Sequence, residues 1–517
     1  MLPAGVDLII LDDGTDNITN LNGLSCLTSI GGSLRIEFNN MLTDLTGLAN
    51  VTSIGESLII KDNPMLTDLT GLANVTSIGE DLVIQSNAML TDLIGLANLT
   101  SIGGTLFIDA NNVLTDLAGL ANVTSIGGTL RIENNDLLTD LTGLDNVNSI
   151  GGNLFISDND LLTDLIGLDN VTSIGGGMLI ENNPLLTDLT SLANVTSIVG
   201  GMVIENNDLL TDLTGLANVI SIGGDISISD NALLSDLSGL NNLISIVGNL
   251  QISNNDLLTD LTGLGNVTSI GGDLVIFNND MLTDLTGLAN VTSTGGNLLI
   301  SDNDLLTDLT GLDNVTSIGG FLGIVDNAML TDLTGLANVT NIWGGLIIED
   351  NAMLTNCCIL CALFAEDAID DIVIGNYINI QNNAAGCQSL SDIEVCSPCE
   401  RPAEPVDIPT LSQWGLITLL LLFMTYGSLA MLGTTRLAGV NAYSLSLANN
   451  KIFRLPFSYG VYRIALLLTA LLVVLGFTAS LATIGTILIS DIVGSLIAAP
   501  IFAYLMHLLY LMEQNRK

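Results

Sequence analysis

The sequence predicts an all-β chain, a parallel β-solenoid of 24-residue coils, followed by a C-terminal α-helical transmembrane module. Three observations predict this fold. A 24-residue phrase repeats through most of residues 1–356, its aliphatic residues do not follow a helical spacing, and long apolar runs occur after residue 407. Aromatic residues make up only 4% of the 517 residues and the mean hydropathy is +0.59, which fits a thin aliphatic core joined to a membrane part.

The repeat gives the coil its outline. Residues 41–64 read MLTDLTGLANVTSIGESLIIKDNP, and residues 65–88 repeat that phrase with few changes. A degenerate copy starts at Ile18, and counting it and the capped last copy gives fifteen coils. Within one coil the aliphatic residues lie at Leu42, Leu45, Leu48, Val51 and Ile54, and then at Leu58 and Ile60.

A spacing of three residues is not the i, i+3, i+4, i+7 stripe of a helix, so these aliphatics line a coil. The alternation of Leu58 and Ile60 predicts a short strand, and Gly47 and Gly55 mark the corners. Because one coil cannot bury its own apolar side, neighbouring coils must stack at about 4.8 Å. Fifteen coils then form a rod of roughly 70 Å.

Charge divides the chain into two parts. Residues 1–407 carry four basic and 52 acidic residues, whereas residues 408–517 carry six basic and two acidic ones. The net charge of −44 leads us to expect no nucleic-acid partner. The single histidine, His507, lies in an apolar stretch, which excludes Ser/His/Asp and Cys/His catalysis and histidine-based zinc sites in the solenoid.

Two asparagine ladders repeat through the solenoid. We expect their amides to stack and to bond backbone groups that the corners leave unpaired. Glycosylation of the Asn-Val-Thr triplets is the alternative, and it is disfavoured because a glycan on every coil would crowd at strand spacing. One ladder has fourteen members between Asn39 and Asn351, including Asn63, Asn87 and Asn111, and the other has thirteen between Asn50 and Asn338, including Asn74.

An aspartate ladder of thirteen members runs from Asp44 through Asp68 and Asp92 to Asp332. We expect each carboxylate to accept backbone N–H groups in an Asx turn. Repulsion between stacked carboxylates should raise some of their pKa values. Weak Ca²⁺ binding at this ladder is one alternative, although we expect no cofactor, and a polysaccharide-active site built on an aspartate cluster is another.

The phrase Leu58-x-Ile60-x-x-Asn63-x-x-Leu66, continued by Leu69, Leu72 and Ile78-Gly79, resembles the receptor L domain. That family is a right-handed, leucine-rich-repeat-like β-helix of growth-factor-receptor ectodomains and many bacterial surface proteins. The resemblance covers roughly residues 8–395 and implies a binding module without catalysis. This sequence has many more coils and neither a furin-like cysteine-rich domain nor a kinase, so a hormone-receptor role is not implied.

Six cysteines lie in residues 357–400, where the repeat breaks. They predict a disulfide-stapled cap that closes the open end of the core, with fifteen pairings open. Metal binding through two Cys-x-x-Cys pairs is the alternative. Cys26 replaces a ladder asparagine, and we expect it to be a free buried thiol. The six cap cysteines are Cys357, Cys358, Cys361, Cys387, Cys396 and Cys399.

A linker at residues 401–407 leads into a predicted first transmembrane helix at 408–433. The start of this segment resembles the bacterial IPTL-type C-terminal protein-sorting signal. That resemblance implies a Gram-negative envelope protein and a sorting or processing enzyme as a partner. The matching residues are Ile408, Pro409, Thr410, Leu411, Ser412, Gln413, Trp414 and Gly415.

The chain continues beyond a simple sorting signal. We expect a basic cytoplasmic loop at 434–463, transmembrane helices at 464–484 and 491–512, and a cytoplasmic tail at 513–517. The positive-inside rule places both basic segments in the cytoplasm and the solenoid outside, in the periplasm or at the cell surface. We expect Asp491 to cap the third helix and His507 to lie at the interface. No basic and apolar leader precedes Val6, so we expect one upstream of Met1.

The sequence therefore predicts a non-enzymatic, membrane-anchored envelope protein whose solenoid serves adhesion or recognition of a glycan or protein. A structural spacer or a periplasmic sensor is the alternative, favoured by the near-identity of the coils, and a polysaccharide-active enzyme is a remote one. The repeat breaks modestly where Thr294 replaces a core isoleucine, where Trp343 replaces a corner glycine, and at the aromatic residues Phe277 and Phe321.

Overall fold

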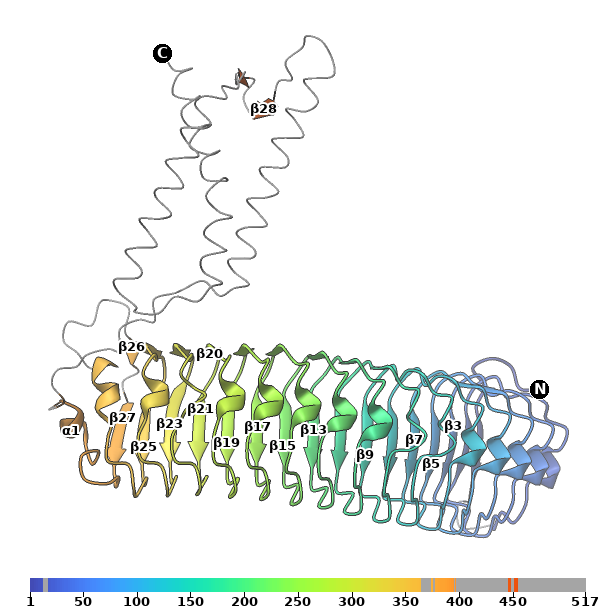
Figure 1. Cartoon of the computed structure of the whole chain (residues 1–517). Helices are drawn as coiled ribbons and strands as arrows, with labels where there is room; N and C mark the ends of the chain where they lie inside the picture. Colours follow the sequence, from blue (N-terminus) through green and yellow to red (C-terminus); the bar gives the residue numbers. More distant parts are fainter. Residues whose placement is uncertain are drawn as a thin grey trace, which may run out of the picture. The chain divides into compact units, whose positions relative to one another are not determined.

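The structure is a computed structural model that describes residues 1–12, 17–363, 373–374, 377–394, 396, 445–447 and 451–453. The chain divides into two compact units, Met1–Pro402 and Ala403–Lys517. The first unit is a parallel β-solenoid, which confirms the predicted all-β stack of coils (Figure 1).

The main sheet of the solenoid contains 16 parallel strands, one from each turn of the chain. Leu34 and Leu346 occupy the same register position on its second and fifteenth strands, and every step between them advances the chain by one repeat. Only the first step, from Leu8 to Leu34, and the last, from Leu346 to Ile378, are longer than the repeat. The predicted 24-residue period is therefore confirmed. In spatial order the strands are β1 (Leu8–Leu11), β2 (Leu34–Glu37), β3 (Leu58–Lys61), β5 (Leu82–Gln85), β7 (Leu106–Asp109), β8 (Leu130–Glu133), β9 (Leu154–Ser157), β11 (Met178–Glu181), β13 (Met202–Glu205), β15 (Ile226–Ser229), β17 (Leu250–Ser253), β19 (Leu274–Phe277), β21 (Leu298–Ser301), β23 (Phe321–Val325), β25 (Gly345–Glu349) and β27 (Tyr377–Gln381).

A second ladder of very short strands lies on another side of each coil. Its residue pairs, most of them Ser-Ile, form parallel strands or single bridges, and the isoleucines from Ile30 to Ile342 point into the core. The strands are β4 (Ser77–Ile78), β6 (Ser101–Ile102), β10 (Ser173–Ile174), β12 (Ser197–Ile198), β14 (Ser221–Ile222), β16 (Ser245–Ile246), β18 (Ser269–Ile270), β20 (Ser293–Thr294), β22 (Ser317–Ile318), β24 (Asn341–Ile342) and β26 (Val373–Ile374).

Most coils also contain one 3₁₀ turn, which the spacing of three residues produces because a 3₁₀ helix has three residues per turn. A side chain on the glycine of such a turn would meet the coil before it: a Cβ added to Gly71 would overlap the carbonyl oxygen of Leu45. The turns are η1 (Asn22–Leu24), η2 (Thr46–Leu48), η3 (Thr70–Leu72), η4 (Ile94–Leu96), η5 (Ala118–Leu120), η6 (Thr190–Leu192), η7 (Thr214–Leu216), η8 (Ser238–Leu240), η9 (Thr262–Leu264), η10 (Thr286–Leu288), η11 (Thr334–Leu336) and η12 (Cys358–Leu363).

The core is a column of aliphatic side chains. The seven aliphatic positions of the coil at residues 41–64 are all buried, and the same positions are buried in the coils that follow. Thr294, which replaces an isoleucine, is also buried and donates its hydroxyl to the carbonyl oxygen of Gly296 at 3.1 Å. Each fully buried aliphatic side chain stabilises the fold by about 1.5–3 kcal/mol, so the column is the main source of stability.

One corner of every coil is left-handed, although the sequence marked the corners only by glycine. Fifteen non-glycine residues have φ between 52° and 60°, and they lie directly before the buried asparagines, as Asp62 lies before Asn63. Asp and Asn tolerate this conformation best among residues with side chains, because their short polar groups bond the local backbone. They occupy most of these fifteen positions, whereas Phe38, Ser86 and Ala110 do not follow the preference.

The C-terminal end of the solenoid carries the predicted disulfides. Cys357 is bonded to Cys387 and Cys358 to Cys396, with Cα–Cα distances of 5.4 and 5.5 Å. Cys361 is also disulfide-bonded, and Cys399 lies outside the described residues. These bonds join η12 to the segment around α1 (Leu390–Glu394), the only α-helix among the described residues.

The second unit is described only at β28 (Leu445–Leu447) and β29 (Lys451–Phe453), which form an antiparallel pair. Both lie in the segment that the sequence predicts as a basic loop at 434–463. The predicted linker, the sorting motif at Ile408–Gly415 and the three predicted spans lie outside the described residues. Within the described part of the chain, no helix combines the length and the apolar character needed to cross a membrane.

Candidate functional site

The outward face of the main sheet carries a row of side chains at one register position, which is the second residue of each four-residue strand and the third residue of β23, β25 and β27. Because side chains alternate along a strand, this position points away from the core in every coil. Half of the members are aliphatic, and Ile59, Val83, Leu179 and Val203 among them are half-buried. The row changes character across β7, β8 and β9, where three consecutive coils carry two aromatic residues and an arginine.

Phe107, Arg131 and Phe155 are register partners on these adjacent strands and form what we call the Arg131 stack. The guanidinium carbon of Arg131 lies 4.9 Å from the ring centroid of Phe107 and 5.9 Å from that of Phe155. Both distances are within the range of a cation–π interaction, which contributes about 0.5–1 kcal/mol at an exposed site. Arg131 is the only basic residue of the described solenoid that lies between two aromatic rings.

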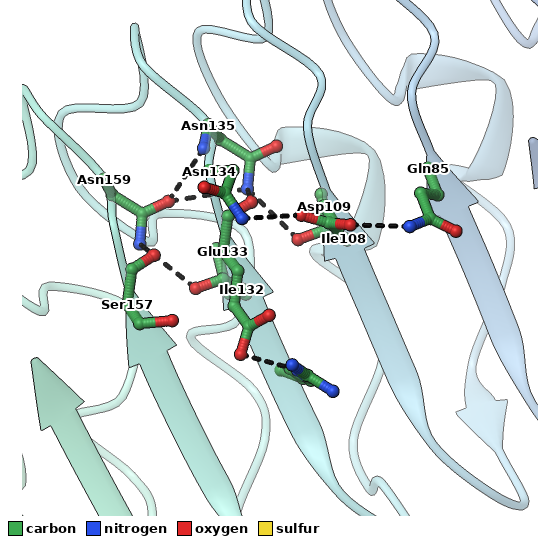
Figure 2. Close-up of polar contacts among 10 residues, drawn as sticks. Gln85, Ile108, Asp109, Ile132, Glu133, Asn134, Asn135, Ser157 and Asn159 are labelled. Atoms are coloured by element: carbon green, nitrogen blue, oxygen red, sulfur yellow. Dashed lines mark hydrogen bonds and ion pairs between the residues drawn. The ribbon is translucent and has the colours of Figure 1, made fainter. Parts of the chain in front are cut away.

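Two buried carboxylates lie beside the stack, at the fourth position of β7 and β8. Glu133 is 7% exposed and forms an ion pair with Arg131, with a distance of 2.5 Å between Nε and Oε1. Asp109 is 8% exposed and accepts hydrogen bonds from Gln85 Nε2 at 2.7 Å and Asn134 Nδ2 at 2.9 Å (Figure 2). The hydrogen bond and the charge of Glu133 raise the pKa of the Arg131 guanidinium despite partial burial, so the stack keeps its positive charge.

The stack and its polar neighbours form one connected surface. Their side chains are held by ring contacts, an ion pair and amide–carboxylate bonds from four adjacent strands, β5 to β9. Such a surface can bind an elongated ligand along the row, with its apolar groups against the rings and its polar groups against the carboxylates.

The predicted inner asparagine ladder lies in the core and bonds backbone groups. Its members are 0% exposed from Asn39 to Asn351. Asn63 Nδ2 donates to the carbonyl oxygens of Ile36 in the coil before, at 2.9 Å, and of Lys61 in its own coil, at 3.0 Å. Each amide oxygen in turn accepts from the asparagine of the coil before. Only Asn39 Oδ1, at the N-terminal end of the ladder, has no hydrogen-bond partner among the described residues.

The outer asparagine ladder is on the surface. Asn50 and Asn74 are exposed, and their Nδ2 groups donate to the carbonyl oxygens of Ser25 and Ala49 at 2.7 Å. This position explains Cys26, which is free but exposed, so the expectation of a buried thiol was wrong. Cys26 occupies a register position of this outer ladder, whose side chains lie against the coil surface and not in the core.

The predicted aspartate ladder forms Asx turns at the start of the 3₁₀ turns. Asp44 Oδ1 accepts from the backbone N–H of Thr46 at 3.0 Å and from its hydroxyl at 2.5 Å. These bonds lower the pKa of Asp44, with the hydroxyl bond as the largest cause. The equivalent bond from Thr310 likewise lowers the pKa of Asp308. Asp68 and Asp92 make the same turn, with Thr70 N–H at 2.8 Å and Ile94 N–H at 3.0 Å.

The prediction that stacking raises pKa values in the aspartate ladder is therefore wrong for Asp44 and Asp308. A threonine hydroxyl and a backbone N–H stabilise each ionised carboxylate more than burial destabilises it. Raised pKa values occur elsewhere. Burial, Asp158, Glu205 and Glu133 raise the pKa of Glu181 on the main sheet. Among the described residues, no three or more His, Cys, Asp or Glu side chains are grouped so that they could hold a metal ion.

The aromatic residues singled out in the sequence lie apart from the Arg131 stack. Phe277 is half-buried on β19. Phe321 and Tyr377 are 42% and 52% exposed, and their rings meet edge to face at 6.5 Å. Trp343 is 62% exposed at a corner, in the place of a glycine.

The sequence did not identify Phe107, Arg131 and Phe155. A signal was present, since all three fall at one register position in successive coils and replace aliphatic residues there. Detecting it requires knowing that this position points outward in every coil. A further ladder was also missed, in which side-chain oxygens at the residue before many of the main strands accept the backbone N–H of the next coil, as Asn153 accepts from Gly177 at 2.7 Å.

A scan against protein-family models found no match to this chain, and a search of curated proteins found no relative.

Proposed function

We propose that this chain is a non-enzymatic, membrane-anchored protein of a bacterial cell envelope, and that the Arg131 stack on its solenoid is a recognition surface for adhesion. The observation that carries this proposal is the change at one register position: three consecutive coils of a near-identical repeat carry Phe107, Arg131 and Phe155 on the outward face. A regular rod needs no such change for its own stability, because neighbouring coils use aliphatic residues there.

The charge around the stack favours one class of ligand. Arg131 is already neutralised by Glu133, and further carboxylates follow on the same edge of the sheet, at Glu181 and Glu205. The whole first 407 residues carry 52 acidic residues against four basic ones. A polyanion would be repelled, so the ligand is an elongated molecule of neutral or positive charge that can place an apolar face on phenylalanine rings.

The sequence supports the anchor. Apolar runs at 408–433, 464–484 and 491–512 have the length of membrane spans, and the basic residues between and after them favour a cytoplasmic loop and tail. The resemblance to the IPTL-type sorting signal and to the right-handed receptor L domain supports an extracytoplasmic solenoid in a Gram-negative envelope. The disulfide bonds of the cap agree with an oxidising compartment.

Binding tests the recognition role. The purified full chain in detergent micelles is applied to arrays of neutral glycans, acidic glycans and basic peptides. The test variant combines Phe107→Val, Arg131→Gln, Glu133→Ser and Phe155→Ser, all residues that occur at the same register positions in other coils. The control variant combines Val203→Ser, Val275→Ser and Leu299→Ser in the same row. We expect the test variant to lose at least about tenfold in affinity and the control to bind normally.

Two results would contradict the recognition role. Binding only to acidic glycans would contradict the charge argument, and equal loss in both variants would mean that the Arg131 stack is not the contact surface.

Fractionation of the native host with protease shaving of intact cells tests the location separately. A solenoid that is protected until the outer membrane is broken would place it in the periplasm, facing away from the medium.

A structural spacer is the second candidate, and one observation favours it. The register of the main sheet advances by one repeat at every step from Leu34 to Leu346, without a break. A spacer depends on length and not on any surface residue. Deleting three whole coils outside β5–β11 would impair a spacer in proportion to length, whereas it would leave binding by the Arg131 stack unchanged.

A further inference from the structure

One face of the solenoid carries no charge, although the chain as a whole has a net charge of −44. We define this neutral face by the residues that flank the short strands, from Thr100–Gly104 to Thr340–Gly344. In each of these eleven coils, two residues drawn from Thr, Ser, Asn and Ile precede the buried core residue, and two small or apolar residues follow it. The Asp and Glu residues of these coils all lie at other positions.

Four aliphatic side chains interrupt this face near its middle. Val199, Ile220, Ile244 and Val247 are 62–64% exposed, more than any other described aliphatic side chain except Met1. Neighbouring coils carry threonine or glycine at the same register positions. A contiguous patch of large exposed aliphatic side chains indicates an interaction surface, whereas single ones scattered along the rod would not.

The backbone changes at the same place. Within the described coils, the ladder of short strands links Ile30 to Ile222 and Ile246 to Ile374, and its one gap lies between Ile222 and Ile246. Ile220 N–H donates to the carbonyl oxygen of Thr196 at 3.0 Å, and Thr268 N–H to that of Ile244 at 2.9 Å. In the described coils, the equivalent bond from Ile244 to Ile220 is not made, nor is the one from Val247 to Ile222.

At the gap, two coils leave backbone hydrogen bonds unmade beside exposed apolar side chains. Ser221 and Ser245 are exposed at the gap, whereas Ser197 and Ser269 at the same register position are half-buried. The main sheet remains paired at this level, from Ile226 to Leu250, so the gap is a local feature of one face. Exposed β-branched side chains next to this local break in the coil-to-coil hydrogen bonds form an apolar patch, and such patches mark interaction sites.

We propose that the neutral face is an interface between two copies of this chain, centred on the gap between Ile222 and Ile246. The absence of charged residues on this face favours a second copy of the chain as the partner. Elsewhere two copies would meet through carboxylates: the exposed Met and Leu row that includes Leu161 and Leu209, for example, lies next to Asp160 and Asp208. On the neutral face, two strongly acidic solenoids can contact each other without bringing carboxylates together.

The size and symmetry of the face fit this arrangement. Ten steps of about 4.8 Å and a width of four residues at about 3.3 Å give roughly 600 Å² per copy. Two copies together then bury about 1,200 Å², the lower end of the range for specific interfaces. A twofold axis near the gap places the four aliphatic residues of one copy against those of the other, since the cluster lies near the middle of the face.

The first experiment measures the oligomeric state of the purified full chain in detergent micelles by sedimentation. The test variant returns the cluster to the repeat, with Val199→Gly, Ile220→Thr, Ile244→Thr and Val247→Gly, and circular dichroism checks that it is folded. We expect a dimer whose dissociation constant rises at least about 100-fold in the variant. Added salt should strengthen the wild-type dimer, because it screens repulsion between the acidic rods. A monomeric wild type, or a dimer that the variant leaves unchanged, would overturn the proposal.

Cross-linking in the native membrane provides the second readout. In a Cys26→Ser background, Ser221→Cys places a thiol beside the proposed axis, and Thr187→Cys places a control thiol on an exposed position outside the neutral face. We expect Ser221→Cys to form a disulfide-linked dimer and Thr187→Cys to form none. A Ser221→Cys product with the mass of a different partner would also contradict an interface between two copies. The outcome does not depend on the Arg131 stack, so it leaves the proposed recognition role untouched.

Discussion

Asn63 donates two hydrogen bonds to one atom of Asn87: its backbone N–H lies 3.3 Å and its Nδ2 lies 3.2 Å from Asn87 Oδ1. The same pair of bonds recurs down the inner ladder, with Asn135 and Asn159 at 3.2 and 3.4 Å. Every member thus completes the hydrogen bonding of the coil before it. This makes the ladder a continuous polar column inside an aliphatic core, in which removing one amide removes hydrogen bonds from several buried groups at once.

We predict that Asn159→Ala destabilises the solenoid by about 3 kcal/mol or more. The substitution removes one donor from the carbonyl oxygens of Ile132 and Ser157, and it removes the acceptor shared by the backbone N–H and Nδ2 of Asn135, all in the buried part of the coil. Urea unfolding of the full chain followed by circular dichroism measures the loss. Asn146→Ala is the matched control, because its exposed amide bonds only the carbonyl oxygen of Ala121, and we expect about 1 kcal/mol or less. Equal losses would mean that burial of the ladder does not matter.

The left-handed corner gives a second prediction. Ala110 has φ of 53° although its side chain makes no polar contact that would stabilise this conformation, so Ala110→Gly should stabilise the solenoid by about 1 kcal/mol. Asn206, at φ of 53°, occupies the same corner in a later coil, and Asn206→Ala should destabilise it. Thermal unfolding of the two variants should shift the midpoint in opposite directions. A lower midpoint for Ala110→Gly would show that the flexibility that glycine adds to the unfolded chain outweighs the relief of strain.

The regular part of the fold is predictable because one pattern is repeated many times. The aliphatic spacing from Leu42 to Ile60 predicts the coil, its inward residues and its short strand, and stacking follows because a single coil cannot bury that side. The buried asparagine at position 63 is equally visible. A polar residue that recurs in every coil between core positions must satisfy the backbone there.

The candidate site is not predictable from the same pattern, because it consists of departures from the pattern. Phe107, Arg131 and Phe155 are distant in sequence and become neighbours only through the register of the main sheet. The gap beside Ile244 depends on backbone hydrogen bonds that are not made, and the type of residue at a position does not predict their absence. The sequence predicts the Asx turn at Asp44 but not the hydrogen bond from the Thr46 hydroxyl, which is the largest cause of the lowered pKa.

The carboxylate of Glu181 should respond to pH. Burial, Asp158, Glu205 and Glu133 raise its pKa, and Glu205 is its direct register partner on the next strand. A raised folded-state pKa means that Glu181 contributes stability when protonated, below about pH 4, and loses that contribution as the pH rises through the folded-state pKa. Glu181→Gln should therefore be more stable than wild type at pH 7 by about 0.2–1 kcal/mol.

Asp44 is the control for Glu181, because its pKa is shifted in the opposite direction. Bonds from Thr46 lower the pKa of Asp44, so its contribution is present at neutral pH and is lost as the pH falls through the lowered folded-state value. Asp44→Asn should destabilise the chain at pH 7 and have no effect near pH 2. Unfolding midpoints measured from pH 2 to pH 8 separate the two cases. If both variants behaved alike across this range, total charge and not the local contacts would control the pH dependence.

The ion pair of the Arg131 stack predicts a rescue. Arg131→Gln leaves Glu133, 7% exposed, without its 2.5 Å partner, and an unpaired buried charge is costly, so we expect a loss of about 2–3 kcal/mol. The double variant Arg131→Gln with Glu133→Ser should recover most of that loss, because Ser occupies the same position in Ser157 and Ser253. Urea unfolding of the single and double variants measures the loss of stability and its recovery. A double variant as unstable as the single one would place the cost in the lost ring contacts.

The cap should stabilise its own end of the rod and little else. The bond between Cys357 and Cys387 closes a separation of 30 residues, and removing such a bond costs about 3 kcal/mol. In a stacked repeat each coil contacts only its neighbours, so this loss should stay local. Replacing both cysteines, Cys357→Ala with Cys387→Ala, should increase backbone hydrogen exchange in β25 and β27 while β2 to β9 keep their protection. Because these two cysteines are removed together, no unpaired thiol remains to form a wrong bond with Cys358 or Cys396. Loss of protection along the whole solenoid would instead mean that the cap holds the rod in one cooperative unit, and that the regular stack is not stable coil by coil.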